Sequence, residues 1–400
     1  MAQRNVLFVH SLNPLDPVGG AEASLISLVS SLDEQKFKAL VALSAPCTTQ
    51  QQLNDMGVRT IIVRMDPLHY RLVDKSYLER VLIATRGIAS VCGLIRIILT
   101  RRVHGVCTNV QGAHLYGAIA SWITRRPHIL YMRDLPQGAF STKLFPQIAG
   151  LLADHIIAIS QAVERFFVTH PRHGQRCASK ISLIQNGLNI ETFTDQTPDC
   201  GVRQELQVEP GCAVVTMVGR LQAWKGQKDF LEAARIVLQK HPNARFLIVG
   251  DVVQSEPHFR DELVELAGQL GIGKSVVFTG HRSDIRAIFS ITDIAVCASW
   301  YEPFGRVVAE AMAMAKPVIG TRAGGIPDII VDGETGYLVN PRDPSSLAGG
   351  ICAILTDRDK GREMGRLGRM RVLAHFDMVN VTRKVTRVFD LVFSGHRSAE

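Results

Sequence analysis

Short apolar runs alternate with segments of helical periodicity along the whole chain of 400 residues, and this alternation constrains the fold most strongly. Strands that are each followed by a helix pair in parallel, with helices covering both faces of the sheet. The predicted strands of the first half are 6–9, 38–43, 60–63, 105–108, 128–132, 156–159 and 181–184. Those of the second half are 213–218, 245–249, 276–279, 294–298, 317–320 and 336–339. The pattern predicts an α/β protein with doubly wound, Rossmann-like sheets.

The length predicts two domains, because 400 residues exceed what one ordinary hydrophobic core supports. A stretch from 191 to 211 has few apolar residues and contains two prolines, as a linker would. We expect domains at 1–195 and 196–378, followed by a last helix within 379–400. That helix carries one apolar stripe, formed by Val381, Val385, Val388 and Val392. Open parallel sheets bind ligands at the carboxyl ends of their strands, so two such domains facing each other would form a cleft.

The amino-acid composition indicates what class of protein this is. Hydrophobic residues make up 46% of the chain and charged residues 20%, which is typical of a soluble globular protein. The eight cysteines contain no Cys-x-x-Cys pair and the histidines do not cluster at ligand spacing, so we expect neither a disulfide framework nor a zinc site. The N-terminal segment is too short and too polar for a secretory signal. These features predict a cytoplasmic protein.

The positive charge is uneven. The net charge is +8, and the first 200 residues account for +6 of it, with 20 Lys and Arg against 14 Asp and Glu. A basic first half suggests an acidic partner, such as a phosphorylated acceptor or an anionic membrane surface. Nucleic acid is not expected as a partner, because the sequence carries no signature of a nucleic-acid-binding module.

The longest apolar stretch, 81–100, is interrupted by Arg86 and Arg96, and a charge at bilayer depth is costly. At helical spacing, one face is formed by Ile88, Val91, Cys92, Ile95 and Leu99. This pattern favours a helix packed on a sheet over a helix lying on a membrane surface. The two alternatives are compatible if the basic flank from Arg96 to Arg102 touches lipid headgroups.

A short turn in the second half carries two acids, Glu302 and Glu310, around Gly305. It follows a predicted strand and begins a predicted helix over 306–315, which ends at Lys316-Pro317 because proline lacks an amide hydrogen. The free N–H groups of such a helix start attract phosphate. Because Glu302 precedes the helix and Glu310 lies on its second turn, the two carboxylates could hold the two ends of an elongated ligand with a charged middle. A nucleotide sugar has this shape.

A second turn of the same kind carries two cations. A predicted strand ends at Gly219 and Arg220, and Lys225-Gly226 begins the next predicted helix, which runs to about 240. This turn brings two cations together with the free amides at the start of a helix. Such a combination predicts a diphosphate site.

Three further turns are weaker signals, each of which could be a plain turn. Gly19-Gly20 follows the first strand, and paired glycines let a backbone approach a ligand closely. Thr321 begins a glycine-containing turn that could lie near the sugar, and Gly280-His281 could lie near the base. The pair Asp357 and Asp359 follows no strand, so we interpret it as a solvated surface and expect no bound metal.

Taken together, these motifs resemble the retaining glycosyltransferases of the two-Rossmann-domain (GT-B) architecture, family 4, also called group 1. The resemblance covers nearly the whole chain. It rests on an ordered set of motifs: Gly19-Gly20-Ala21-Glu22, 153–160, Asn186-Gly187, Val218-Gly219-Arg220, Lys225-Gly226, Gly280, 302–305, 310–313, 316–320 and 333–336.

The resemblance implies a role for each matching residue. Glu302 looks like the acid that binds sugar hydroxyls, and Glu310 like the acid that binds the ribose. Arg220 and Lys225 look like the pair that holds the diphosphate and stabilises the departing nucleotide. Further donor contacts are expected from Phe304, Gly305, Arg306, Val307, Gly219, Gly20, Gly19, His281 and Thr321. The last helix resembles one that crosses back to the N-terminal, acceptor-binding domain.

One position departs from the family pattern. Many relatives carry a histidine after the strand that ends here in Arg133-Asp134. We therefore expect Arg133, Asp134 and Asn109 to contact the sugar or an acidic acceptor.

The resemblance implies transfer of a sugar from a nucleoside-diphosphate sugar, UDP- or GDP-linked, to a hydroxyl acceptor with retention of anomeric configuration. No metal or other cofactor is expected. The acceptor is expected to be lipid-linked or anionic, in bacterial surface polysaccharide or glycolipid synthesis, with possible peripheral contact with the inner face of the cell membrane. Two alternatives share the architecture: a non-catalytic nucleotide-sugar binder and a nucleotide-sugar epimerase.

Overall fold

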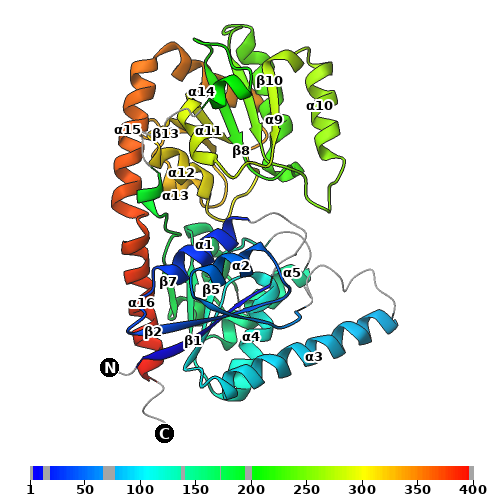
Figure 1. Ribbon diagram of the computed structural model, residues 1–400, viewed down its shortest axis with the longest axis vertical. Coiled ribbons are helices and arrows are strands. Elements are labelled where there is room, and N and C mark those ends of the chain that lie inside the picture. Colours follow the sequence, from blue (N-terminus) through cyan, green and yellow to red (C-terminus); the bar gives the residue numbers. More distant parts are fainter. Residues whose placement is uncertain are drawn as a thin grey trace. The chain divides into compact units, whose positions relative to one another are not determined.

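The computed structural model describes residues 3–11, 19–65, 77–136, 140–171, 173–193 and 201–395. They form two compact units (Figure 1). Unit 1 comprises residues up to Gly187 together with those from Met378 onwards, and unit 2 comprises Leu188–Asp377. The first division thus falls at 187/188 and not at 195. Part of the predicted linker, 194–200, lies outside the described residues, and the remainder of it belongs to unit 2.

Unit 1 is built on a parallel sheet of seven strands in the order β3-β2-β1-β4-β5-β6-β7. The strands are β1 (Arg4–His10), β2 (Phe37–Leu43), β3 (Arg59–Ile62), β4 (Gly105–Thr108), β5 (His128–Met132), β6 (His155–Ala158) and β7 (Ile181–Leu183). The helices are α1 (Gly20–Ser30), α2 (Thr48–Asp55), α3 (Tyr77–Thr100), α4 (Gln111–Thr124), α5 (Phe140–Leu152), α6 (Gln161–Val168), α7 (Gly174–Ala178) and α16 (Met378–Gly395).

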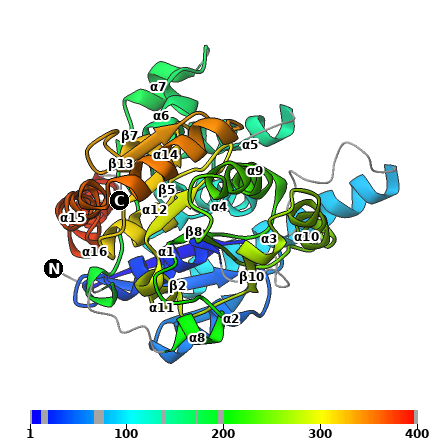
Figure 2. The ribbon, with the colours of Figure 1, turned by 90° about the horizontal axis from the view of Figure 1, so that it is seen from above.

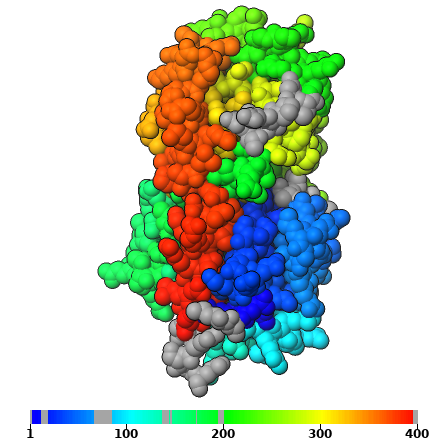
Figure 3. Space-filling view, turned by 60° about the vertical axis from the view of Figure 1, so that its left-hand side comes forward, coloured from blue at the N-terminus to red at the C-terminus, as the bar shows by residue number. Residues whose placement is uncertain are grey.

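The last helix of the chain, α16, is part of the core of unit 1. Its predicted stripe of four valines is buried. Phe389 packs against Phe37 with ring centroids 5.5 Å apart, and Arg4 in β1 pairs with Asp390 at 3.1 Å. Phe393 lies so close to Gly105 that a side chain at that position would overlap its ring. In Figure 3, α16 (red) covers residues from the start of the chain (blue).

Unit 2 is built on a parallel sheet of six strands in the order β10-β9-β8-β11-β12-β13. The strands are β8 (Val214–Val218), β9 (Arg245–Val249), β10 (Val276–Gly280), β11 (Ile294–Cys297), β12 (Val318–Thr321) and β13 (Gly336–Val339). The helices are α8 (Val202–Glu205), α9 (Gln227–Leu238), α10 (Phe259–Gln269), α11 (Ile285–Ile291), α12 (Arg306–Ala313), α13 (Ile326–Ile329), α14 (Pro344–Thr356) and α15 (Arg358–His375).

Both sheets confirm the predicted fold class. Every predicted strand occurs, with ends that differ by no more than two residues from those expected. The four inner strands of unit 2, β9, β8, β11 and β12, are largely buried and rich in β-branched residues, as strands covered by helices on both faces should be. Neighbouring strands are never joined directly, because a parallel connection needs a crossover.

The predicted buried face of α3 is only partly correct, because Val91 and Ile95 pack against the core and the other three residues do not. Ile88 is 65% exposed and Leu99 60%, and Cys92 is also exposed. The buried side chains are instead those of Leu94, Ile97 and Ile98, which pack in the core of unit 1. Figures 1 and 2 both show α3 running out past the edge of this unit. The helix is apolar around most of its circumference, so periodicity alone could not identify the face that packs.

A buried histidine in β5 makes the stability of unit 1 depend on pH. The Nε2 atom of His128 lies 2.9 Å from the Thr108 hydroxyl, and burial together with nearby Lys180 lowers the pKa of His128 to about 3. In the unfolded chain this pKa is about 6.5, so at pH 5 the unfolded state binds a proton that the folded state does not. We expect the free energy of unfolding to fall by about 2 kcal/mol between pH 7.5 and pH 5.

Urea unfolding at the two pH values measures this loss. In a His128→Gln variant the unfolding free energy should depend less steeply on pH. An identical pH dependence in the variant and the wild type would assign the effect to other groups.

Candidate functional site

Three neighbouring strands of unit 2 bring the predicted charged residues to one edge of the sheet. β8, β11 and β12 lie side by side, and all three run in the same direction. Arg220 follows β8, Glu302 follows β11, and Thr321 ends β12. The turns at this edge therefore form one local arrangement, which we call the unit 2 site.

The central contact of the unit 2 site is an ion pair. The Nζ atom of Lys225 lies 2.6 Å from Oε2 of Glu302, and the hydroxyl of Ser299 lies 3.3 Å from the same oxygen. The two charged side chains are only 16% and 15% exposed. A lysine ammonium has three N–H donors, so the ion pair leaves donors of Lys225 for an anion.

Aromatic side chains join the two turns that carry this pair. Trp224 and Tyr301 stack with ring centroids 4.6 Å apart and an interplanar angle of 18°. The ammonium of Lys225 lies 4.2 Å from the centroid of the Trp224 ring, and the amide of Trp300 donates to the carbonyl of Trp224. These contacts hold Lys225 in place. They were not predicted, although an aromatic residue directly before each charged residue was a visible signal.

Arg220 supplies a second cation. Its side chain is half-buried, and within the described residues its guanidinium has no hydrogen-bond or ion-pair partner. The side-chain amide of Gln227 donates to the carbonyl of Arg220 at 2.9 Å and fixes the backbone there. Next to it, Gly219 leaves space that the aliphatic part of Lys225 borders. A half-buried guanidinium and a lysine five residues later in the same turn favour binding of a phosphate or diphosphate.

Helix α12 begins at the same edge, and Gly305 precedes it with a φ of 102°, a backbone conformation that favours glycine. Nε of Arg306 donates to Oε1 of Glu310 at 2.7 Å. Burial raises the pKa of Glu310, and Arg306 opposes that rise. The two acids thus have separate cationic partners. Phe304 is buried against Phe376, so its ring belongs to the core and only its backbone could contact a ligand.

The turn after β12 contacts the backbone of Glu302. The amide of Gly325 donates to the carbonyl of Glu302 at 2.8 Å. A Cβ atom at Gly324 would overlap this carbonyl, so the turn can approach Glu302 only with glycine at that position. Thr321 is buried, and its hydroxyl donates to the carbonyl of Ser299 at 2.5 Å. The side chain of Thr321 therefore links the turn after β11 to the end of β12, and its predicted contact with the donor stays a prediction.

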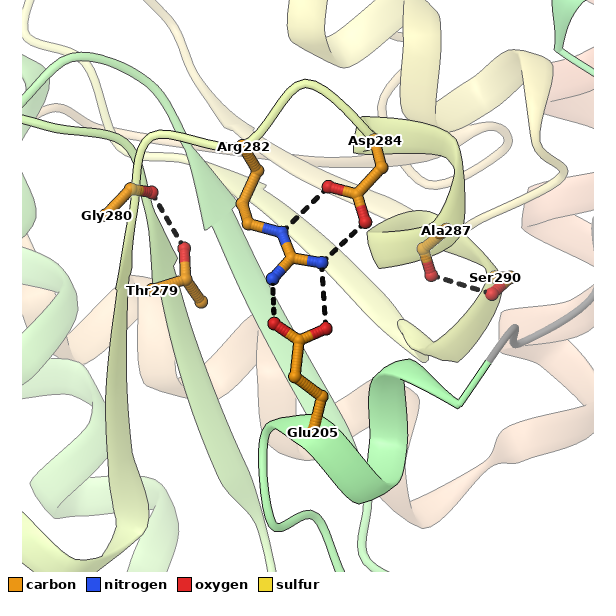
Figure 4. Close-up of polar contacts among 7 residues, drawn as sticks. All are labelled: Glu205, Thr279, Gly280, Arg282, Asp284, Ala287 and Ser290. Carbon is orange, nitrogen blue, oxygen red and sulfur yellow. Dashed lines mark hydrogen bonds and ion pairs between the residues drawn. The ribbon is translucent and has the colours of Figure 1, made fainter.

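His281, predicted to lie near a base, is exposed after β10. The following arginine has a different environment (Figure 4). Arg282 donates to Asp284 on one side and to Glu205 of α8 on the other. Hydrogen bonds from Arg282 lower the pKa of both carboxyls. Because two carboxylates already neutralise it, Arg282 ties α8 to the sheet and is a poor candidate for binding phosphate.

In unit 1, Gly19 is the residue before α1, and its amide donates to Oε2 of Glu22 at 2.9 Å. The other oxygen of Glu22 lies 3.3 Å from Nε2 of His10 at the end of β1. Gly20 is the first residue of the helix and is exposed. The residue before this pair, Val18, lies outside the described residues.

The three predicted acceptor residues lie at neighbouring strand ends of unit 1. Nε of Arg133 donates to Oδ1 of Asn109 at 3.2 Å, and its guanidinium also donates to Asn186 and lies 3.9 Å from the Tyr131 ring centroid. The side chain of Arg133 is buried. Asp134 accepts a hydrogen bond from the first amide of α4. The sequence indicated Asn186 only as part of the Asn186-Gly187 motif. Its contact with Arg133 could not be predicted from the sequence.

Within the described residues, no group of three or more His, Cys, Asp or Glu side chains is arranged to hold a metal ion. No described helix combines the length and the apolar character needed to cross a bilayer.

Known proteins resemble the chain in sequence. Residues 202–371 match the family described as Glycosyl transferases group 1. The D-inositol 3-phosphate glycosyltransferase of Corynebacterium urealyticum is 30% identical over 217 residues, which are 53% of this chain and 51% of that protein. The glycogen synthase of Mycobacterium tuberculosis is 28% identical over 226 residues, 56% of this chain and 51% of that protein. The chain spans about half the length of the curated relatives that it matches.

A solved structure extends the likeness to the whole chain. The crystal structure of Anabaena Alr3699/HepE in complex with UDP and glucose is 26% identical, with a TM-score of 0.83. The alignment covers 97% of this chain and 100% of that chain. The chain therefore has the GT-B architecture, and residues 202–371 resemble the group 1 glycosyltransferases.

Proposed function

We propose that this protein transfers a sugar from a nucleoside-diphosphate sugar to a hydroxyl acceptor and retains the anomeric configuration. The observation that carries the proposal is the placement of Arg220 and Lys225 in the turn after β8, with Lys225 paired to Glu302 in the turn after β11. The complex of Anabaena Alr3699/HepE with UDP and glucose supports a donor of this class.

Cleavage of the donor would leave negative charge on the departing phosphate and oxocarbenium character on the sugar. Arg220 and Lys225 would stabilise that negative charge, together with the free amides at the start of α12. Both cations are half-buried, so the electrostatic interaction is stronger than it would be in water. Lys225 is already oriented by Glu302 and Trp224, and little reorganisation would be needed when the donor binds.

The acids would bind the two ends of the donor. Glu302 would accept hydrogen bonds from sugar hydroxyls while it holds Lys225, and Glu310 would accept them from the ribose while it holds Arg306. We assign neither acid as a nucleophile, because each has its own cationic partner. We propose that the reaction needs no metal, with the two cations neutralising the phosphates.

Unit 1 would bind the acceptor, near Arg133, Asn109 and Asp134 at the ends of β4 and β5. Buried Arg133 would hold an anionic or hydroxyl-bearing group of the acceptor, with its guanidinium oriented by the hydrogen bonds to Asn109 and Asn186. Gly20 would contribute its backbone amide to the donor phosphate, because the amide of Gly19 already donates to Glu22. An acceptor of bacterial surface polysaccharide or glycolipid synthesis fits this proposal.

A thermal-shift screen with UDP, GDP and ADP, and then with their sugars, tests the donor class. A ligand at a hundred times its dissociation constant should stabilise the folded protein by about 2.7 kcal/mol, which raises the melting temperature by roughly 5–10 °C. The active donor should then release its nucleoside diphosphate in the presence of EDTA. Binding without release over a broad acceptor panel would favour a non-catalytic binder, and conversion of the donor without acceptor would favour an epimerase.

A further inference from the structure

A groove of about 680 Å³ lies in unit 1 between β3, which is an edge strand, and α3. The described residues that line it are Ile61, Ile62, Val63, Arg64, Arg86, Ala89, Ser90, Gly93, Arg96, Ile97, Thr100 and Arg101. No residue of the unit 2 site belongs to it, and neither do the predicted acceptor residues.

Small residues of α3 build the groove. The Ser90 hydroxyl bonds to the carbonyl of Arg64 at 2.6 Å and to that of Arg86 at 2.8 Å, so one side chain joins the two walls. Gly93 lets the helix approach Val63, because a Cβ atom there would lie 3.3 Å from its methyl group. From Arg86 to Thr100 the helix rises about 21 Å, which makes the groove elongated.

The walls are cationic. Four of the twelve described lining residues are arginines and none is Asp or Glu. Within the part of the chain that the structure describes, the exposed side chains of Arg96 and Arg101 have no hydrogen-bond or ion-pair partner. An exposed guanidinium of this kind binds phosphate through two parallel N–H donors.

The surface beside the groove is apolar. At 3.6 residues per turn, Ile88, Cys92 and Leu99 form a stripe along α3 that adjoins the groove, and Arg96 lies between the two. Ile88 is 65% exposed and Leu99 60%, and Ile62 on the opposite wall is 40% exposed. A cationic groove beside exposed apolar side chains differs from a simple anion site, which needs no apolar surface.

We propose that this groove and the adjoining stripe of α3 dock on a membrane surface, with the groove binding phosphate headgroups of anionic phospholipids. The arginines match the charge of the headgroup phosphates, and Ile88 and Leu99 reach the level of the acyl chains. The elongated groove can hold more than one headgroup. This proposal goes beyond sugar transfer and does not depend on it, since none of the residues belongs to the unit 2 site.

Sedimentation with lipid vesicles tests the proposal. The wild type should sediment with vesicles of phosphatidylcholine and phosphatidylglycerol, and remain in solution with vesicles of phosphatidylcholine alone. The double variant R96Q/R101Q should partition onto the mixed vesicles roughly 30-fold more weakly, equivalent to about 1 kcal/mol for each arginine. Leu99→Ser should also weaken partition, through the loss of its apolar side chain.

The matched control is R165Q/R176Q, which removes two exposed arginines from α6 and α7, near the β7 edge of the same sheet. This control should partition like the wild type. Equal partition of R96Q/R101Q and R165Q/R176Q would overturn the proposal, as would equal binding to both kinds of vesicle. Binding of inorganic phosphate at the groove without sedimentation would identify a soluble phosphate ligand and would also overturn it. Release of nucleotide from a soluble donor should be the same in all these variants.

Discussion

Replacing Lys225 by alanine is expected to lower kcat by about a hundred- to a thousandfold, which corresponds to a loss of roughly 2.7–4 kcal/mol of transition-state stabilisation. The ammonium would stabilise charge that develops on the leaving phosphate, so its removal should affect turnover more than donor binding. Its contacts with Glu302 and Trp224 hold it in position before the donor arrives. The measurement is the steady-state rate of nucleoside diphosphate release.

Lys228→Ala is the matched control for this experiment. Lys228 lies on α9 close to Lys225, but it is exposed and pairs with Glu262 on α10. Its removal should leave kcat within about twofold, because exposed ion pairs contribute 0–1 kcal/mol. If Lys225→Ala and Lys228→Ala retained the same turnover, the assignment of Lys225 to the leaving phosphate would be wrong.

Gly324→Ala is expected to destabilise unit 2 by at least about 3 kcal/mol. Gly324 has a φ of 58°, where an L-residue costs roughly 1–2 kcal/mol, and the new Cβ atom would overlap the backbone carbonyl of Glu302. That carbonyl belongs to the main chain and cannot rotate away, so the turn that carries Glu302 must move. Urea unfolding should show the loss, and nucleotide release should fall with it because Glu302 and Lys225 are displaced.

Gly268→Ala provides the comparison. Gly268 lies within helix α10, and an added Cβ atom there would meet open space. Alanine in a helix is favoured over glycine by about 1 kcal/mol, so this variant should be as stable as the wild type or more stable. A Gly324→Ala protein that unfolded at the same urea concentration as Gly268→Ala would contradict the close approach described for this turn.

The sequence predicted the sheets well because buried parallel strands leave a strong local signal. The run 294–298 is continuously apolar and is bounded by polar residues, so β11 could be placed within one residue. The turns after β8 and β11 were recognised for the same reason, since each follows a predicted strand. The contact between Lys225 and Glu302 was not predicted.

Other features depend on tertiary contacts that no local pattern encodes. The packed face of α3 was only partly predicted because apolar residues surround most of that helix. Of the two carboxylates that contact Arg282, that of Glu205 lies 77 residues away in the sequence and that of Asp284 only two. Only the contact with Asp284 could be expected from the sequence. The stack of Trp224 on Tyr301 likewise requires two loops to meet. The function of Arg133 remains a proposal, although its buried contacts with Asn109 and Asn186 are now known.

The discontinuous course of unit 1 has a consequence for biosynthesis. The strands of this unit emerge from the ribosome before unit 2, but α16, which buries Phe37 and closes over Gly105, is translated after unit 2. Unit 2 is complete once Asp377 has emerged, whereas the nascent first unit must wait with part of its apolar surface uncovered. Chaperone binding to nascent chains should therefore persist at residues 1–187 until translation of the last helix ends.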